Sequence, residues 1–232
     1  MAQRYSHIIW DWNGTLFDDA AWCVEVNNRM LAARGLRPIA GIEEYRNVFA
    51  FPVINYYRQI GLDFKKEPFE ALAHEYNAAY YAGVAGGLHA GAEAVLEAVY
   101  NEGVAQVILS ASEKNNLISQ VSQFGIAKYF DKILGVSDIY GKSKVELALD
   151  YIAANHVDRA LLVGDTDHDY ETALAIGADC VLIPNGHQSR ARLLACGAPV
   201  LEDIRGVLNC IRTAMSNQTV RTDLPKREGG EQ

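Results

Sequence analysis

Three short apolar runs, far apart in the chain, each lead into residues that can bind a metal ion or a phosphate group. The first leads into Asp11, the second into Ser110, and the third into Asp165. Apolar runs of this length are typical of strands buried on both faces of a parallel sheet. Because ligands of open parallel α/β sheets bind at the carboxyl ends of the strands, the pattern predicts such a sheet with a functional site along that edge.

Segments with helical periodicity alternate with the apolar runs from residue 90 onward. We predict helices over 90–101, 113–123, 143–155 and 169–176, strands over 104–109, 132–135, 160–163 and 179–183, and two further helices over 187–195 and 204–214. Strands that alternate with helices of this length require right-handed crossovers. The predicted fold class is therefore α/β, with a Rossmann-like parallel sheet covered by helices on both faces.

Residues 17–83 follow a different pattern. Their periodicity predicts helices over 20–34, 42–50, 53–60 and 68–81, and no strand-like alternation interrupts them. This is the pattern of an all-helical insertion between the first two core strands, and the glycine-rich stretch 83–91 gives the chain a flexible return. The predicted domains are an α/β core formed by 1–16 and 84–215, a helical cap formed by 17–83, and a flexible tail over 216–232.

Composition restricts the partners that such a chain can have. Half of the 232 residues are apolar (50%), and the formal net charge is −8. A negative chain without a stripe of Lys and Arg is a poor match for nucleic acid. No stretch has the roughly 18 apolar residues of a membrane span and no secretory signal is evident, so we expect a cytoplasmic monomer or homodimer without membrane contact. The four cysteines lack C-x-x-C spacing, which predicts reduced side chains and no zinc ligation.

The residues around the first and third runs suit phosphate and metal chemistry. Asp11 can act as a nucleophile or as a ligand for a hard cation, and Gly14 lets the backbone turn so that amide groups can surround an anion. The plain alternative for this stretch is an Asx turn after an ordinary strand. The acidic pair Asp165 and Asp169 strengthens the metal interpretation, since three acids close together would otherwise repel one another.

Four motifs occur in a fixed order: Asp-Trp-Asn-Gly-Thr-Leu at 11–16, Val-Ile-Leu-Ser-Ala-Ser at 107–112, a lysine at 142 or 144, and Gly-Asp-Thr-Asp-His-Asp at 164–169. With these motifs the chain resembles the haloacid dehalogenase superfamily, from about residue 7 to 210. More narrowly it resembles the branch of phosphoglycolate phosphatase-like proteins, which carry a helical cap after the first motif. The resemblance implies a hydrolase with Mg²⁺ as its cofactor that removes phosphate from a small phosphorylated metabolite.

The resemblance also implies roles for particular residues. Asp11 is the expected nucleophile, which forms an aspartyl-phosphate that water then hydrolyses. The expected metal ligands are Asp11, the backbone carbonyl of Asn13, Asp165 and, more indirectly, Asp169. The expected phosphate-binding groups are Ser110, the backbone amides of Trp12, Asn13 and Ala111, and Lys144. We prefer Lys144 to Lys142 because it adjoins the predicted helix, and we expect Asp167 to face solvent.

Asn13 departs from the family pattern. In relatives that hydrolyse phosphate esters this position usually holds an aspartate that protonates the leaving alcohol, whereas a carboxamide cannot transfer a proton at useful pH. Three explanations stay open: a substrate with a good leaving group, a substitute such as His168, His187 or a cap residue, or a weakly active relative. The alternative function is accordingly a catalytically weak protein that binds a phosphorylated ligand or regulates through it.

We expect the cap to select the substrate. Cationic and aromatic side chains gather around Pro52, and one or two of them could face the site: Arg46, Phe49, Phe51, Tyr56, Tyr57 and Arg58. Aromatic residues at helical spacing more often serve packing, which is the expectation for Tyr76, Tyr80 and Tyr81.

Overall fold

The computed structural model describes residues 5–83, 85–137 and 143–212. Its centre is a five-stranded sheet in the order β5-β4-β1-β6-β7, in which every neighbouring pair is parallel. The strands are β1 (His7–Trp10), β4 (Ala105–Glu113), β5 (Lys132–Val136), β6 (Ala160–Gly164) and β7 (Asp179–Leu182). The predicted α/β class with a parallel sheet is therefore confirmed.

Helices cover both faces of this sheet because the side chains of a strand alternate between faces. Ile8 and Trp10 of β1 pack into an apolar core shared with α5 (Ala92–Asn101), α6 (Lys114–Gln123) and α10 (Val207–Arg212). Ile9 points the other way, into a core shared with α7 (Lys144–Asn155), α8 (Asp167–Ile176) and α9 (Arg190–Ala195). Within the described residues, no helix has the length and apolar character that crossing a membrane requires.

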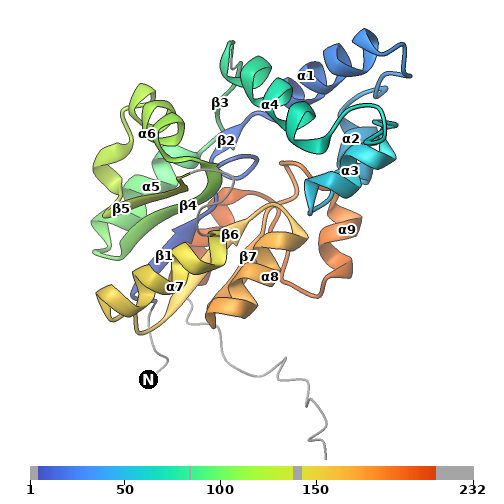
Figure 1. Ribbon diagram of the computed structural model, residues 1–232. Coiled ribbons are helices and arrows are strands. Elements are labelled where there is room, and N and C mark those ends of the chain that lie inside the picture. The colour runs from blue at the N-terminus through green and yellow to red at the C-terminus, as the bar shows by residue number, and fades with distance from the viewer. Residues whose placement is uncertain (1–4, 84, 138–142, 213–232) are drawn as a thin grey trace, which may run out of the picture.

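Four helices form a separate layer above the core, at the upper right of Figure 1. They are α1 (Ala20–Ala33), α2 (Ile42–Val48), α3 (Val53–Gln59) and α4 (Phe69–Tyr81). They surround an apolar cluster of their own, in which Trp22, Tyr45, Tyr56 and Leu72 are buried. An independent core of this kind supports the cap proposed for residues 17–83.

Two short strands carry the chain between the layers. β2 (Phe17–Asp18) pairs antiparallel with β3 (Gly87–Leu88), and the sequence pattern did not predict either strand. Two-residue strands are too short to show alternation, so only the pairing reveals them. The glycine-rich return predicted for 83–91 includes a position that requires glycine. A Cβ on Gly86 would lie 2.7 Å from the Asp18 carbonyl oxygen.

Three further predictions need correction. β4 continues through Glu113, past a register irregularity after Leu109, so Ser110 lies within the strand. The last core helices start late: α9 begins at Arg190, and a 3₁₀ turn (Ile204–Gly206) precedes α10. Residues 187–188 stay outside α9 because their side chains bond to Asp19 and to Asp167 across the fold. Lys142 and the predicted tail 216–232 lie outside the described residues.

Candidate active site

The carboxyl ends of β1 and β6 place two acids side by side. Asp11 directly follows β1 and Asp165 directly follows β6, and the amide of Asp11 donates to the Val163 carbonyl at 2.9 Å. Asp169 joins them from the first turn of α8. Carboxylate oxygens of Asp11, Asp165 and Asp169 all lie within 4.8 Å of one another, and all three residues are buried.

Lys144 is the cation of this acidic cluster. It is the first residue of α7, where Ser143 caps the helix and forms a reciprocal capping box with Glu146. Its Nζ contacts Asp11 Oδ1 at 2.7 Å and Asp169 Oδ1 at 2.6 Å, and only 7% of its side chain is exposed. The structure therefore places the ammonium group of Lys144 beside Asp11, whereas Lys142 lies outside the described residues and the choice between the two lysines stays a prediction.

The second oxygen of Asp169 serves the local backbone. Asp169 Oδ2 accepts from the amides of Asp165 and Thr166 at 3.2 and 3.1 Å, and from the Thr166 hydroxyl at 2.7 Å. Both carboxylate oxygens of Asp169 are therefore occupied by this chain. This arrangement favours a supporting role, in which Asp169 orients Lys144 and the loop that carries Asp165.

Burial and charge act in opposite directions on these groups. Burial raises the pKa of Asp11 to about 6, even though the Lys144 ammonium works against it. Burial likewise raises the pKa of Asp165 to about 8. For Lys144, burial favours the neutral amine, but the carboxylates of Asp11 and Asp169 outweigh it and raise the pKa. Burial also disfavours the Asp169 carboxylate, yet the Lys144 ammonium outweighs it and lowers that pKa. One ammonium group does not balance three buried carboxylates.

Asn13 is bonded on both sides of its carboxamide. Its Nδ2 donates to Asp19 Oδ2 at 2.8 Å and contacts the Tyr80 hydroxyl at 3.0 Å, while its Oδ1 accepts from Ser112 Oγ at 2.7 Å. Ser110 Oγ is further away, at 3.4 Å from Asn13 Oδ1. The side chain of Asn13 thus links β4 of the core to α4 of the cap.

The other predicted phosphate-binding groups lie around the same edge of the sheet. Ser110 is buried and its Oγ accepts from the Ser112 amide at 3.1 Å. The side chain of Trp12 is buried and donates to Gln120 at 3.0 Å, so only its backbone can face a ligand. Ala111 is exposed. Asp167, expected to face solvent, instead binds Arg192 at 2.7 Å and accepts from the Gln188 side chain at 2.8 Å.

Thr15, Asp19 and Tyr80, not assigned to the site from the sequence except as part of a general cap candidate, and His187, named there as a possible substitute acid, complete the walls of the site. Thr15 donates to Asp165 Oδ1 at 3.1 Å, and the His187 amide donates to Asp165 Oδ2 at 2.6 Å. Asp19 and Tyr80 reach the Asn13 carboxamide from the cap. These partners are distant in sequence or belong to an unremarkable helix start, so no local pattern marks them.

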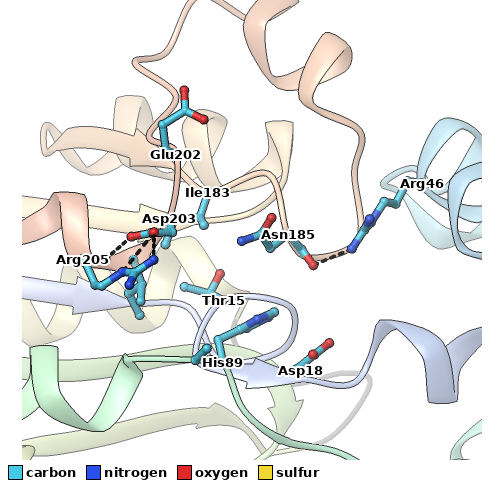
Figure 2. A pocket seen from close by; sticks show the side chains of 11 residues that line it. Thr15, Asp18, Arg46, His89, Ile183, Asn185, Glu202, Asp203 and Arg205 are labelled. Atoms are coloured by element: carbon cyan, nitrogen blue, oxygen red, sulfur yellow. Dashed lines mark hydrogen bonds and ion pairs between the residues drawn. The ribbon is translucent and has the colours of Figure 1, made fainter.

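Cap and core also meet at a pocket of about 450 Å³ next to Thr15, shown in Figure 2. Arg46 lines it from the cap, and its guanidinium donates to the carbonyls of Asn185 and Gly186 at 2.7 and 2.9 Å. Of the cap residues singled out in the sequence, Arg46 therefore does face the core. Arg58 instead lies over the Phe64 ring inside the cap.

Two glycines let the loops approach Asp165. A Cβ on Gly186 would lie 2.1 Å from Asp165 Oδ2, and one on Gly14, where φ is +76°, would lie 2.3 Å from the same atom. We expect Gly186→Ala to displace Asp165 and lower phosphate release by about 10- to 100-fold, mainly by weakening metal binding. Activity against Mg²⁺ concentration measures this, and Gly87→Ala, whose Cβ meets nothing within 4 Å, is the control. Equal Mg²⁺ dependence in both variants would contradict the prediction.

Comparison with known proteins places this site in a family. Residues 8–183 match the family model described as haloacid dehalogenase-like hydrolase, so the chain belongs to that family and is an enzyme of the hydrolase class. The recognition made from the four motifs is confirmed.

Two of the similar proteins are phosphatases. The chain is 25% identical over 223 residues to a phosphoglycolate phosphatase of Pseudomonas fluorescens (strain Pf0-1), covering 89% of this chain and 80% of the relative. It is 24% identical over 187 residues to a phosphoglycolate phosphatase of Rhodobacter capsulatus, covering 78% of this chain and 85% of the relative. Among solved structures, Protein Tyrosine Kinase A of Mycobacterium tuberculosis has the same fold, with a TM-score of 0.74, 24% identity, and coverage of 90% of this chain and 99% of the other.

Proposed function

We propose that this protein is a Mg²⁺-dependent phosphatase that hydrolyses a small phosphomonoester through an aspartyl-phosphate on Asp11. The observation that carries the proposal is the convergence of the carboxylates of Asp11, Asp165 and Asp169 at the carboxyl edge of the sheet, with the Lys144 ammonium in contact with Asp11 and Asp169. The two curated relatives, both phosphoglycolate phosphatases, support the substrate class.

The donor set fits a hard divalent cation. Burial raises the pKa of Asp11 to about 6 and that of Asp165 to about 8, so the buried acid cluster carries its full negative charge only when a counter-ion offsets it. Asp11, Asp165 and the Asn13 carbonyl would hold the ion, with Asp169 acting through water. Bound there, Mg²⁺ would supply charge neutralisation between the Asp11 carboxylate and the anionic phosphoryl group.

The side chains and backbone amides of the site have separate roles in the proposed reaction. Asp11 provides the attacking carboxylate oxygen, and Lys144, held by Asp169, restrains the Asp11 side chain and offsets charge on the phosphoryl oxygens. Ser110 and the amides of residues 12, 13 and 111 donate to the oxygens that are not transferred. Cap closure excludes water during the first transfer, and water hydrolyses the aspartyl-phosphate in the second.

Metal removal tests the proposal directly. We expect chelation to reduce phosphate release from a panel of phosphomonoesters, including 2-phosphoglycolate, to background, because the acid cluster then repels the substrate. Adding Mg²⁺ back should restore turnover, and circular dichroism checks that the chelated protein stays folded. Turnover that persists in the folded, chelated protein would rule out a metal-dependent reaction.

A second candidate function follows from Asn13. A carboxamide does not transfer a proton at useful pH, so Asn13, held by Asp19, Tyr80 and Ser112, supplies none to a leaving group. A protein with this arrangement could bind a phosphorylated ligand while turning it over slowly. Calorimetry that finds tight binding of a phosphometabolite without phosphate release would support this candidate over the phosphatase.

Replacing Asn13 with aspartate distinguishes the two candidates. The new carboxyl would stand 2.8 Å from Asp19 Oδ2, where two acids hold a proton between them, so it can protonate a leaving alcohol. We expect Asn13→Asp to raise turnover of alkyl phosphates by about 10²-fold. Aryl phosphates with good leaving groups serve as the control, since they need no acid and should gain little. A loss with both substrate types would show that Asn13 is required as it stands.

A further inference from the structure

A second cluster of buried ligand-type side chains lies at the boundary between cap and core. It consists of Asp19, just before α1, Cys23 in the first turn of α1, and His187 in the loop after β7. Their carboxylate oxygen, thiol sulfur and ring nitrogen atoms all lie within 4.8 Å of one another. None of the three belongs to the acidic cluster described above.

The distances within this cluster match those between ligands of one small ion. His187 Nε2 lies 3.3 Å from Asp19 Oδ1, and Cys23 Sγ lies 3.7 Å from Asp19 Oδ2. Ligands of a tetrahedral zinc ion, at about 2.0 to 2.3 Å from the metal, are separated by roughly 3.3 to 3.7 Å. Asp19 and Cys23 are four positions apart, so the helix brings them to one face. The three side chains thus lie within reach of one ion.

The imidazole is oriented as a metal ligand requires. Tyr45 of α2 is hydrogen-bonded to His187 Nδ1 at 2.9 Å, which leaves Nε2 directed at Asp19. Metal-binding histidines usually have the second ring nitrogen bonded in this way, and the bond sets the tautomer. Asp19 also departs from its ordinary role, because its side chain does not cap α1. It instead accepts from the Gly14 amide at 3.1 Å and the Tyr80 hydroxyl at 2.6 Å.

The charges balance with and without an ion. Without one, the Asp19 carboxylate faces the His187 imidazolium, and Cys23 is a neutral thiol. His187 Nε2 lies 3.3 Å from Asp19 Oδ1, which is an ion-pair distance for a protonated ring. A divalent ion would displace one proton from the imidazolium and one from the thiol, both to solvent. The carboxylate and thiolate then balance the ion, so binding leaves no uncompensated buried charge.

We propose that Asp19, Cys23 and His187 form a site for a divalent transition-metal ion of the Zn²⁺ type, separate from the Mg²⁺ cluster. A set of one oxygen, one nitrogen and one sulfur donor suits Zn²⁺ or Co²⁺ and does not suit Mg²⁺. Because two ligands belong to the cap and one to the core, the bound ion holds the cap against the core. The missing C-x-x-C spacing predicted no zinc ligation. That spacing marks only sites built from neighbouring cysteines, whereas this site joins one cysteine to a histidine far along the chain.

Cobalt spectroscopy tests the site while Mg²⁺ occupies the acidic cluster. The full-length protein is titrated with Co²⁺ in excess Mg²⁺, and we expect one equivalent to produce a sulfur-to-cobalt charge-transfer band together with tetrahedral d–d bands. Cys23→Ser should abolish the charge-transfer band. Cys196→Ser is the matched control and should keep it, since Cys196 is the least buried of the four cysteines. A wild-type protein without the band overturns the proposal, as does a band that survives in Cys23→Ser.

Tyr45→Phe separates a metal site from a simple ion pair. Losing the hydroxyl that orients His187 should weaken Co²⁺ binding by about 10- to 100-fold while the Cys23 thiol remains in place. Unchanged affinity would count against the site. Zn²⁺ should also raise the midpoint of thermal unfolding of the wild type but not of Cys23→Ser, which covers the case that a variant folds poorly. Mg²⁺-dependent phosphate release is measured separately, so either proposal can fail without the other.

Discussion

Replacing Asp11 with asparagine is expected to lower phosphate release by about 10⁴-fold or more while leaving the protein folded. Asparagine has nearly the same shape, and its Oδ1 can still accept a hydrogen bond from Lys144, but its carboxamide does not attack phosphorus. Burial disfavours the charged form of Asp11, as its raised pKa of about 6 indicates. Removing that charge therefore relieves desolvation as well as removing the proposed nucleophile.

Three measurements check this prediction together. Phosphate release gives the rate, thermal unfolding gives the stability, and mass spectrometry after an acid quench detects phosphate bound covalently to the chain. We expect the adduct in the wild type only, and an unfolding midpoint in Asp11→Asn close to that of the wild type. Asp63→Asn, at an exposed acid of the cap, is the matched control. Comparable turnover in Asp11→Asn and Asp63→Asn would remove Asp11 from the reaction.

Replacing Lys144 with methionine is expected to reduce both activity and stability. The ammonium contacts Asp11 and Asp169 at 2.7 and 2.6 Å in a buried position. Methionine keeps much of the stem but leaves both carboxylates without their counter-ion, and removing one partner of a buried ion pair costs about 3 to 5 kcal/mol. Loss of a positioned cation next to the phosphoryl group should lower turnover by about 10³-fold.

Added Mg²⁺ distinguishes the electrostatic cause from poor packing. If uncompensated charge is the defect in Lys144→Met, saturating Mg²⁺ should recover part of the lost stability in chemical denaturation, because the ion neutralises the same carboxylates. Lys128→Met is the control, since Lys128 is exposed and its ammonium lies over the Tyr129 ring rather than beside the acid cluster. A stability loss that Mg²⁺ leaves unchanged would point to packing, and an unchanged rate would exclude Lys144 from catalysis.

Much of the architecture could be predicted from local patterns. Strands buried on both faces must be apolar throughout, and the helices that cover them must have apolar residues at helical spacing. Both patterns can be recognised in the sequence. The predicted positions of β5, β6 and α7 agree with the structure to within about one residue. The proximity of Asp11 and Asp165 could likewise be predicted, because neighbouring parallel strands end at the same edge of the sheet.

Contacts between distant segments account for what local patterns missed. β2 and β3 exist only as a pair, and residues 187–188 leave the predicted helix because Asp19 and Asp167 bond to their side chains. Asp167, expected to face solvent, is half-buried and forms an ion pair with Arg192, a contact that its neighbours in the sequence do not reveal.

The Asn13 position shows the division most clearly. Its identity, read from the chain, indicated that a proton donor is missing, whereas its bonds to Asp19 and Tyr80 depend on how the cap lies on the core. Periodicity and motif spacing are properties of neighbouring residues and survive in a linear string. Hydrogen bonds and ion pairs between cap and core depend on distances that exist only after the chain has packed. They therefore could not be predicted from local sequence patterns.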